Sequence, residues 1–337
     1  MCLFTGTAAR HPSRLARSPD AAPRARPPPP RARLHAGALG GSFEVQMARA
    51  AAEAGLEEVD AGLAAQLQAL LDGTFLRRRS CDRKGPLPAK LRLRRAFRAP
   101  TASSKAWGAY VERREALTIA GLDGPAEALE RRVRTACTMG ALQEELAPEL
   151  NECLLMHGTC PQDAMSIARG GFSLDLDGTQ RTEKEQDGRK QRHKFSAGVY
   201  FAECSSKADE YSSDLSGRSY PKARAAAAPA LAMLVCRVLL GRIRRSTSGV
   251  GREGKADADL RGRLREEGYD SIMGDLEGAP TRTYREFCIP HSDQAFPEFV
   301  IIYERLYGEA GSSYSTSPPK RTSSLQFQVS AIQRPWP

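Results

Sequence analysis

The stretch "NECLLMHGTCPQDAMSIARGGF", residues 151–172, shows a strand giving way to a helix. Its apolar start, CLLM, is typical of a buried strand, and Pro161 suits the first position of a helix. Thr159 and Gln162 have the spacing of a capping box, and the glycine pair at 170–171 is a stop signal. We therefore predict a strand that ends near the HGT triplet, followed by a capped helix.

A histidine and a glycine, His157 and Gly158, lie where the predicted strand ends. Three interpretations are open: turn chemistry, a metal ligand, or the lip of a nucleotide pocket. No partner ligands with suitable spacing accompany the histidine, which disfavours the metal site. Taken alone, a histidine before a glycine is most often a turn residue, so its meaning depends on the rest of the chain.

The composition excludes several classes of protein. Hydrophobic residues make up 41% of the 337, enough to bury a core, and no run approaches the ~18 apolar residues that span a bilayer. The eight cysteines are scattered without a CxxC pair, which argues against a zinc site and a disulfide framework. We expect no membrane contact and reduced thiols, in the nucleus or the cytoplasm, with the nucleus preferred.

The net charge of +10 is concentrated in the front of the chain. Residues 76–98 hold ten Lys and Arg against one Asp, whereas residues 99–337 are neutral overall. The basic stretch is either a solvated face or a surface for nucleic acid. We favour the solvated face, because Phe97 is the one aromatic residue that interleaves the charges. The residues that would contact nucleic acid are Arg77, Arg78, Arg79, Arg83 and Lys84.

Four segments follow from the pattern of apolar and polar residues. Residues 1–48 are Pro- and Arg-rich and are expected to be disordered; a transit peptide is the alternative, which the proline density opposes. Residues 49–84 are expected to form a helix over 49–76 and then a basic linker. The folded domain spans 85–307, and the Ser/Thr/Pro-rich tail 308–337 is expected to be disordered.

Within the folded domain, short apolar runs outnumber helical patterns. Helices are predicted at 104–117, 124–137, 161–170 and 205–211. Strands are predicted at 90–97, 153–157, 198–203, 231–243, 284–290 and 298–306, with charged loops at 175–197 and 244–268. Many short strands with few helices between them indicate an α+β fold built on mostly antiparallel sheets.

Three of these runs carry a joint resemblance: "LLMHGT" (154–159), "GVYFAECSSKADEY" (198–211) and "YREFCIPHSDQAFPEFVIIYE" (284–304). In this order and spacing they resemble the catalytic domain of the poly(ADP-ribose) polymerase (PARP) family, the diphtheria-toxin-like ADP-ribosyltransferases, over about 85–307. The resemblance implies that family's fold, which is two packed, mostly antiparallel β-sheets with short flanking helices.

The resemblance also implies an enzyme, an NAD⁺ ADP-ribosyltransferase and thus a glycosyltransferase. Such enzymes break the bond between nicotinamide and ribose and transfer ADP-ribose to Glu, Asp, Ser or other side chains of protein acceptors, as single units or as polymer. NAD⁺ is then a consumed substrate, and neither a cofactor nor a metal is required. A carboxylate suits this chemistry, because it stabilises the positive charge of an oxocarbenium-like sugar.

Three residues match the family's catalytic triad, and the resemblance gives each a role. Glu286 would hydrogen-bond the 2′-OH of the nicotinamide ribose and help to polarise the acceptor. His157 would hold a ribose hydroxyl, and Tyr200 would complete the triad. The agreement of three residues in order, rather than any one of them, makes the histidine a candidate site residue.

Four more residues match positions that bind NAD⁺ in the family. Gly158, lacking a side chain, would let the carboxamide approach the backbone, and Thr159 would reach the adenine ribose. Lys207 would lie near the glutamate and the donor, and Tyr211 would stack on the nicotinamide ring. The loop 175–197 corresponds to the donor-site loop and would shape acceptor access.

One position departs from the family. Ala208 stands where the family has a serine whose hydroxyl binds the nicotinamide carboxamide. Losing one neutral hydrogen bond costs about 0.5–1.5 kcal/mol, so we expect weaker NAD⁺ binding rather than inactivity. Ser205 or Ser206 would compensate only if the helix shifts. The alternative function is a weak or inactive module that binds NAD⁺ or ADP-ribosylated partners.

Overall fold

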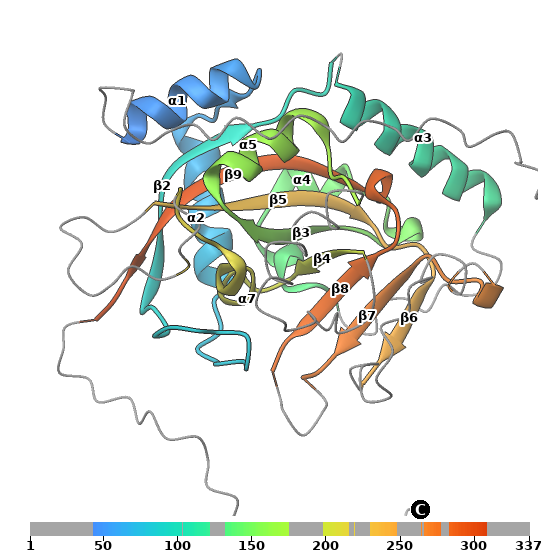
Figure 1. Cartoon of the computed structure of the whole chain (residues 1–337). Helices are drawn as coiled ribbons and strands as arrows, with labels where there is room; N and C mark the ends of the chain where they lie inside the picture. The colour runs from blue at the N-terminus through green and yellow to red at the C-terminus, as the bar shows by residue number, and fades with distance from the viewer. Residues whose placement is uncertain are drawn as a thin grey trace, which may run out of the picture. The chain divides into compact units, whose positions relative to one another are not determined.

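The computed structural model describes the chain in several stretches. They are residues 43–102, 104–121, 132–174, 198–215, 219, 230–247, 264, 266–277 and 283–308. Within them the protein is α+β, as predicted, with one nine-stranded mixed sheet and few helices (Figure 1). The predictions for residues 1–42, for the loop 175–197 and for the tail from 309 fall outside these stretches.

The strands of the sheet follow the order β1-β2-β9-β5-β3-β4-β8-β7-β6. Every neighbouring pair is antiparallel except β6 and β7. All of β5 and nearly all of β9 are buried, as expected for strands covered on both faces. The bounds are β1 Glu57–Glu58, β2 Lys90–Arg98, β3 Glu152–Thr159, β4 Val199–Ala202, β5 Leu231–Leu239, β6 Ile243–Ser246, β7 Ser271–Asp275, β8 Arg285–Ile289 and β9 Ala295–Leu306.

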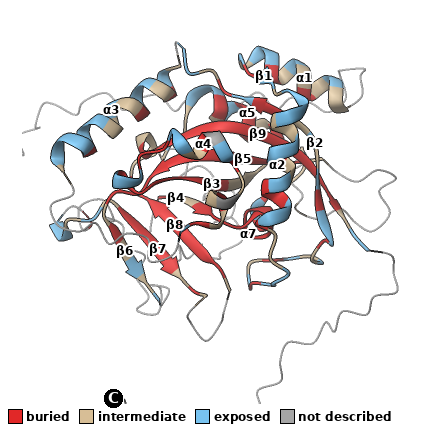
Figure 2. Cartoon of the chain, turned by 180° about the vertical axis from the view of Figure 1, so that it is seen from behind, coloured by how far each residue is buried: buried red, intermediate tan, exposed pale blue. Residues whose placement is uncertain are grey.

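Helices cover both faces of the sheet (Figure 1). One apolar cluster joins α1 (Phe43–Glu53), α3 (Lys105–Ala120) and α5 (Pro161–Gly170) to one face. A second cluster joins α2 (Ala61–Gly73), α4 (Gly140–Glu144) and α7 (Ser205–Ala208) to the opposite face. Figure 2 shows buried strands between helices whose outward sides are exposed. Short 3₁₀ turns complete the described fold at Arg134–Cys137, Pro148–Leu150, Asp209–Tyr211 and Ser292–Gln294.

The join between β3 and β4 is the weakest in the sheet. A single register pair, Met156 with Ala202, connects them, whereas β3 and β5 are paired over eight residues. The join divides the sheet into five strands on one side and four on the other. The structure therefore has one continuous sheet where the resemblance implied two packed sheets, because this one pair keeps the halves connected.

The front of the chain differs from the single helix predicted over 49–76. It forms α1, the short strand β1 and α2. The break falls at Gly55, whose φ of +73° is unfavourable for residues with a side chain. Asp60 then caps α2 by accepting a hydrogen bond from the Leu63 amide at 2.8 Å. Both helices contribute buried residues to the core, so residues 43–84 pack with the segment 85–307 as one unit.

A single strand was also predicted over 231–243, and the structure contains two. β5 ends before Gly241, which adopts a φ of +54°, and β6 begins after it. The Gly241 amide donates to the Leu150 carbonyl at 2.9 Å, which fixes the turn. β6 extends into the predicted loop 244–268, and β7 was not predicted.

The helix at 161 is confirmed, but its predicted capping box is wrong. Thr159 is still the last residue of β3, and the N-cap is Cys160, whose sulfur accepts a hydrogen bond from the Asp163 amide at 3.4 Å. The prediction at 205–211 is confirmed as α7 and a 3₁₀ turn. Of the helix predicted at 124–137, residues up to 131 lie outside the described stretches and the end is a 3₁₀ turn.

Across the parts of the chain that the structure describes, no helix combines the length and the apolar character needed to cross a membrane.

Candidate active site

Three neighbouring strands carry the predicted catalytic triad. His157 lies on β3, Tyr200 on β4 and Glu286 on β8, and these strands are adjacent in the sheet. Tyr200 faces Cys288 across the β4–β8 ladder, and Ala202 faces Glu286. Directly opposed residues, and residues two apart on a strand, share a face of the sheet. Tyr200 and Glu286 therefore project from the same face on adjacent strands.

His157 is joined to the triad through the backbone of its neighbour. Its Nδ1 lies 2.9 Å from the Tyr200 carbonyl oxygen. Because a carbonyl only accepts, Nδ1 carries the hydrogen, and in the neutral ring Nε2 is the acceptor nitrogen. The ring packs edge-on to Phe172 at 5.2 Å and lies 5.8 Å from Phe201. These contacts fix the orientation of the imidazole at the point where β3 and β4 part.

The carboxylate of Glu286 lies beside an ammonium group. Lys207, on α7, has its Nζ 3.6 Å from Glu286 Oε1, and both side chains are almost completely buried. Burial alone would lower the pKa of Lys207, but the charges of Glu286 and of other acids around the ammonium raise it above its ordinary value. The site therefore contains a permanently charged cation next to the predicted catalytic carboxylate.

Tyr211, predicted to stack on the nicotinamide ring, lies next to this cation. The residue is 53% exposed, and the Lys207 ammonium lies 4.9 Å from the centre of its ring. The phenol hydroxyl donates to Asp82 Oδ2 at 3.0 Å. The exposed ring is thus fixed at its polar end, which is compatible with an aromatic surface open to a planar ligand.

Gly158 has a packing role that the sequence did not reveal. A Cβ atom at this position would lie 1.9 Å from the Ala208 carbonyl oxygen and 2.9 Å from the Ser212 hydroxyl. The backbones of β3 and α7 are therefore in direct contact, and only glycine permits it. Thr159 ends β3 opposite Ala232, half-buried.

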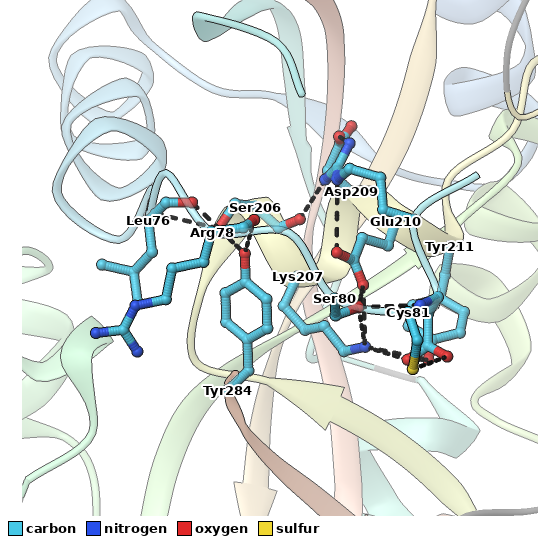
Figure 3. Close-up of polar contacts among 12 residues, drawn as sticks. Leu76, Arg78, Ser80, Cys81, Ser206, Lys207, Asp209, Glu210, Tyr211 and Tyr284 are labelled. Atoms are coloured by element: carbon cyan, nitrogen blue, oxygen red, sulfur yellow. Dashed lines mark hydrogen bonds and ion pairs between the residues drawn. The ribbon is translucent and has the colours of Figure 1, made fainter. Parts of the chain in front are cut away.

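The two serines next to position 208, Ser205 and Ser206, are engaged elsewhere. Ser205 Oγ donates to the Leu71 carbonyl at 2.7 Å. Ser206 Oγ accepts from the Leu76 amide at 3.1 Å and bonds the Tyr284 hydroxyl at 3.3 Å (Figure 3). The Ser205 hydroxyl ties α7 to α2, and the Ser206 hydroxyl ties it to the segment that follows α2, so neither substitutes for a serine at 208 without losing these bonds.

The segment 76–84, called the front strap below, crosses α7 and was not predicted to reach the site. Ser80 is buried in it, and its hydroxyl donates to Glu210 at 2.5 Å (Figure 3). Asp82 Oδ2 accepts a hydrogen bond from the Lys207 ammonium at 2.6 Å. The predicted basic linker therefore contacts residues of the candidate site.

Two of the residues predicted to contact nucleic acid bind the protein itself. Arg83 is 3% exposed, forms an ion pair with Asp209 at 3.0 Å and donates to the Ser206 carbonyl at 2.6 Å. The prediction for Arg83 is wrong, because its guanidinium is buried against α7. Arg78 pairs with Glu277 at 3.3 Å. Four members of the predicted set are exposed: Arg77, Arg78, Arg79 and Lys84.

The second half of the basic stretch, β2, forms ion pairs with acids along its length. Arg92 and Arg94 both contact Glu304. The remaining pairs of β2 are Arg94 with Glu44, Arg95 with Glu58, Arg98 with Glu298 and Lys90 with Asp72. These pairs support the solvated face over a nucleic-acid surface.

Sequence reasoning missed Asp82 and Arg83 as site residues because their partners are distant in the chain. The contacts of the front strap with α7 and the 3₁₀ turn after it join residues 123 to 130 positions apart. The only signal in the sequence was the Asp82–Arg83 pair inside the basic run. By composition, that run cannot be told apart from a solvated linker.

Among the residues that the structure describes, no group of three or more His, Cys, Asp and Glu is placed to hold a metal ion. No protein-family model matches the chain. What the chain does is therefore inferred from the chemistry of this site.

Proposed function

We propose that the protein is an NAD⁺ ADP-ribosyltransferase that acts on protein acceptors. The observation that carries the proposal is the arrangement of Tyr200 and Glu286 on one face of adjacent strands, with His157 bonded to the Tyr200 backbone. Lys207 adds a buried ammonium 3.6 Å from the Glu286 carboxylate. These four residues, all named from the sequence, contact one another in two pairs, His157 with the Tyr200 backbone and Lys207 with Glu286.

In the proposed reaction the bond between C1′ of the ribose and the nicotinamide nitrogen breaks, and nicotinamide leaves with the electron pair. The sugar becomes oxocarbenium-like, and the acceptor attacks C1′ and loses a proton. Glu286 is buried, where a carboxylate stabilises developing positive charge more strongly than in water. Its proposed roles are to hold the ribose 2′-OH, stabilise the sugar cation and orient the acceptor.

The other residues bind and orient the donor in this proposal. The acceptor nitrogen of His157 suits a ribose hydroxyl, and its fixed ring orientation lowers the cost of binding. The half-exposed ring of Tyr211 is the surface for nicotinamide. Gly158 offers backbone groups for the carboxamide, and Thr159 contacts the adenine ribose.

We also propose that the fold is of the ADP-ribosyltransferase type. The single pair between β3 and β4 supports this, because it divides the sheet where His157 and Tyr200 lie. NAD⁺ would bind where these two strands part. We propose a nuclear or cytoplasmic location, with the nucleus preferred.

A second candidate function is a module that binds NAD⁺ or ADP-ribosylated partners without catalysis. Ala208 favours it, because Ser205 and Ser206 are engaged with other groups. Without a serine hydroxyl at 208, bound NAD⁺ lacks one neutral hydrogen bond. This costs about 0.5–1.5 kcal/mol and lowers the affinity for NAD⁺ roughly 2- to 13-fold. The complete triad favours the transferase.

Labelled NAD⁺ separates these functions. We expect the wild type to release nicotinamide and label an acceptor protein, and Glu286→Ala and His157→Ala to lose both activities. Glu112→Ala, an exposed position on α3, is the matched control and retains them. Release without label would indicate a glycohydrolase, and NAD⁺ binding without release would support the binding module. The mobility of the labelled product on a gel distinguishes single units from polymer.

A further inference from the structure

The Lys207 ammonium has two acidic neighbours besides Glu286. Its Nζ lies 2.6 Å from Asp82 Oδ2, 3.0 Å from Glu210 Oε2 and 3.6 Å from Glu286 Oε1. Ion pairs with good hydrogen bonds have nitrogen–oxygen distances of about 2.7–2.9 Å, and a separation of about 3.6 Å is not a hydrogen bond. The cation is thus bonded to two acids and only adjacent to the third.

We propose that Asp82 is a positioning residue of this site. Together with Glu210 it holds the Lys207 ammonium near Glu286 and prevents it from closing onto the Glu286 carboxylate. The cation stays close enough to act on the donor, while the carboxylate keeps its capacity to accept a substrate hydroxyl. This inference rests on the proposed transferase function.

Asp82 is itself held in place by its neighbours in the front strap. Its amide donates to Ser80 Oγ at 3.1 Å, and that hydroxyl bonds Glu210 at 2.5 Å. The next residue, Arg83, is buried and paired with Asp209. Figure 3 shows Ser80 and Glu210 lying with Lys207 and Asp209 in one network. These contacts therefore fix the position of the Asp82 carboxylate.

The same carboxylate also holds the aromatic residue of the site. Asp82 Oδ2 accepts from both the Lys207 ammonium and the Tyr211 hydroxyl. One group thus sets the position of the cation beside Glu286 and of the ring predicted to contact nicotinamide. Asp82 is 33% exposed at its side chain, so it lies at the mouth of the site, not in its core.

The test is a comparison of Asp82→Asn, Asp82→Glu and Asp72→Asn in nicotinamide release from NAD⁺. Asp72 is the matched control, since it is an exposed aspartate paired with Lys90 at 3.1 Å. We expect Asp82→Asn to lower kcat at least tenfold, Asp82→Glu to restore most of it, and Asp72→Asn to match the wild type. In a Lys207→Met background, Asp82→Asn should lower kcat by a much smaller factor, because Asp82 acts mainly through the ammonium and only its bond to Tyr211 remains to be lost.

A second measurement needs no NAD⁺. Urea unfolding midpoints are compared for wild type, Asp82→Asn, Lys207→Met and the double variant. We expect the shift caused by Asp82→Asn to shrink by at least half when Lys207 is absent.

Nicotinamide release tests the transferase proposal, and the unfolding cycle tests whether Asp82 acts on Lys207. If the wild type releases no nicotinamide, the transferase proposal fails, and the unfolding cycle still decides whether Asp82 acts on Lys207. If the wild type is active, an Asp82→Asn variant with wild-type kcat overturns the inference. So does an equal loss of kcat in the presence and absence of Lys207, because a merely structural role would give that result.

Discussion

The two halves of the basic stretch 76–98 have different surroundings in this molecule. The front strap, 76–84, turns inward and brings Asp82 and Arg83 into contact with α7. β2, Lys90–Arg98, runs along the surface with its arginines paired to acids on neighbouring elements. Their compositions are similar, but one half contacts residues of the candidate site and the other is a strand near the edge of the sheet.

The difference teaches that the partner, not the charge, decides what a basic residue does. Arg83 faces Asp209, which is buried and also accepts from Tyr303 and Arg305. Arg92 faces Glu304, which also contacts Arg94. Both acids are shared with another arginine, so the difference lies in the arginine itself: the Arg83 side chain is fully buried, whereas that of Arg92 is 55% exposed. A buried arginine is hard to replace, and an exposed one is not.

The largest effect expected from this comparison is on stability. Arg83→Gln removes one member of a buried ion pair and should lower the free energy of unfolding by about 3–5 kcal/mol. Arg92→Gln, the matched change on β2, should cost about 1 kcal/mol or less. Urea unfolding measures both. Equal losses in the two variants would mean that the front strap is not anchored as described.

A second pair of variants, at two glycines, compares a tightly packed position with an open one. Gly158→Ala places a methyl group 1.9 Å from the Ala208 carbonyl oxygen and should destabilise the protein by about 1–3 kcal/mol. Gly108→Ala, on α3 with nothing near its added Cβ, should stabilise it by about 0.5–1 kcal/mol. Thermal melts check both signs. A neutral Gly158→Ala would show that β3 and α7 are not in backbone contact.

Salt should separate buried from exposed ion pairs. The Arg95–Glu58 pair is partly exposed, so the loss caused by Arg95→Gln should be under about 1 kcal/mol and should vanish near 1 M NaCl, where the Debye length is about 3 Å. The loss caused by Arg83→Gln should persist, because that pair is out of reach of solvent ions. The measurement is urea unfolding at low and high salt. A salt-sensitive Arg83 effect would place its guanidinium at the surface.

The smallest expected effect is a difference in alkylation rate between two cysteines at the edge of the candidate site, Cys81 and Cys160. Burial raises the pKa of Cys160 to about 11, so at about pH 8 roughly one thiol in a thousand is ionised. Cys81, in the front strap, is exposed. Iodoacetamide should alkylate Cys81 faster at pH 8, and Cys160 should become reactive as the pH rises toward 11. Peptide mass spectrometry reads the rates, and equal rates at pH 8 would contradict the burial of Cys160.

The sequence predicted those parts of the molecule that depend on local pattern. The α+β class, β2, β4, β8, β9, α3 and α5 follow from apolar periodicity and from Gly and Pro signals. The boundaries that failed depend on single glycines: Gly55 divides the first helix and Gly241 divides the long strand. A periodic pattern continues through such residues, so only the backbone conformation reveals the break.

The candidate site was predicted in part. The resemblance named His157, Tyr200 and Glu286, and the structure places them on adjacent strands. Asp82 and Arg83 were assigned to a linker, because their partners lie more than 120 residues away. Neither spacing nor composition records contacts of that range.

Nicotinamide release from NAD⁺ by the wild type and by Glu286→Gln tests the central claim most directly. Glutamine keeps the size of the side chain and removes its charge, and Glu112→Gln on the exposed side of α3 is the control. The account predicts steady release by the wild type and the control, and a fall of about 10²–10³-fold for Glu286→Gln. No release by folded wild type, or equal release by all three proteins, would contradict it.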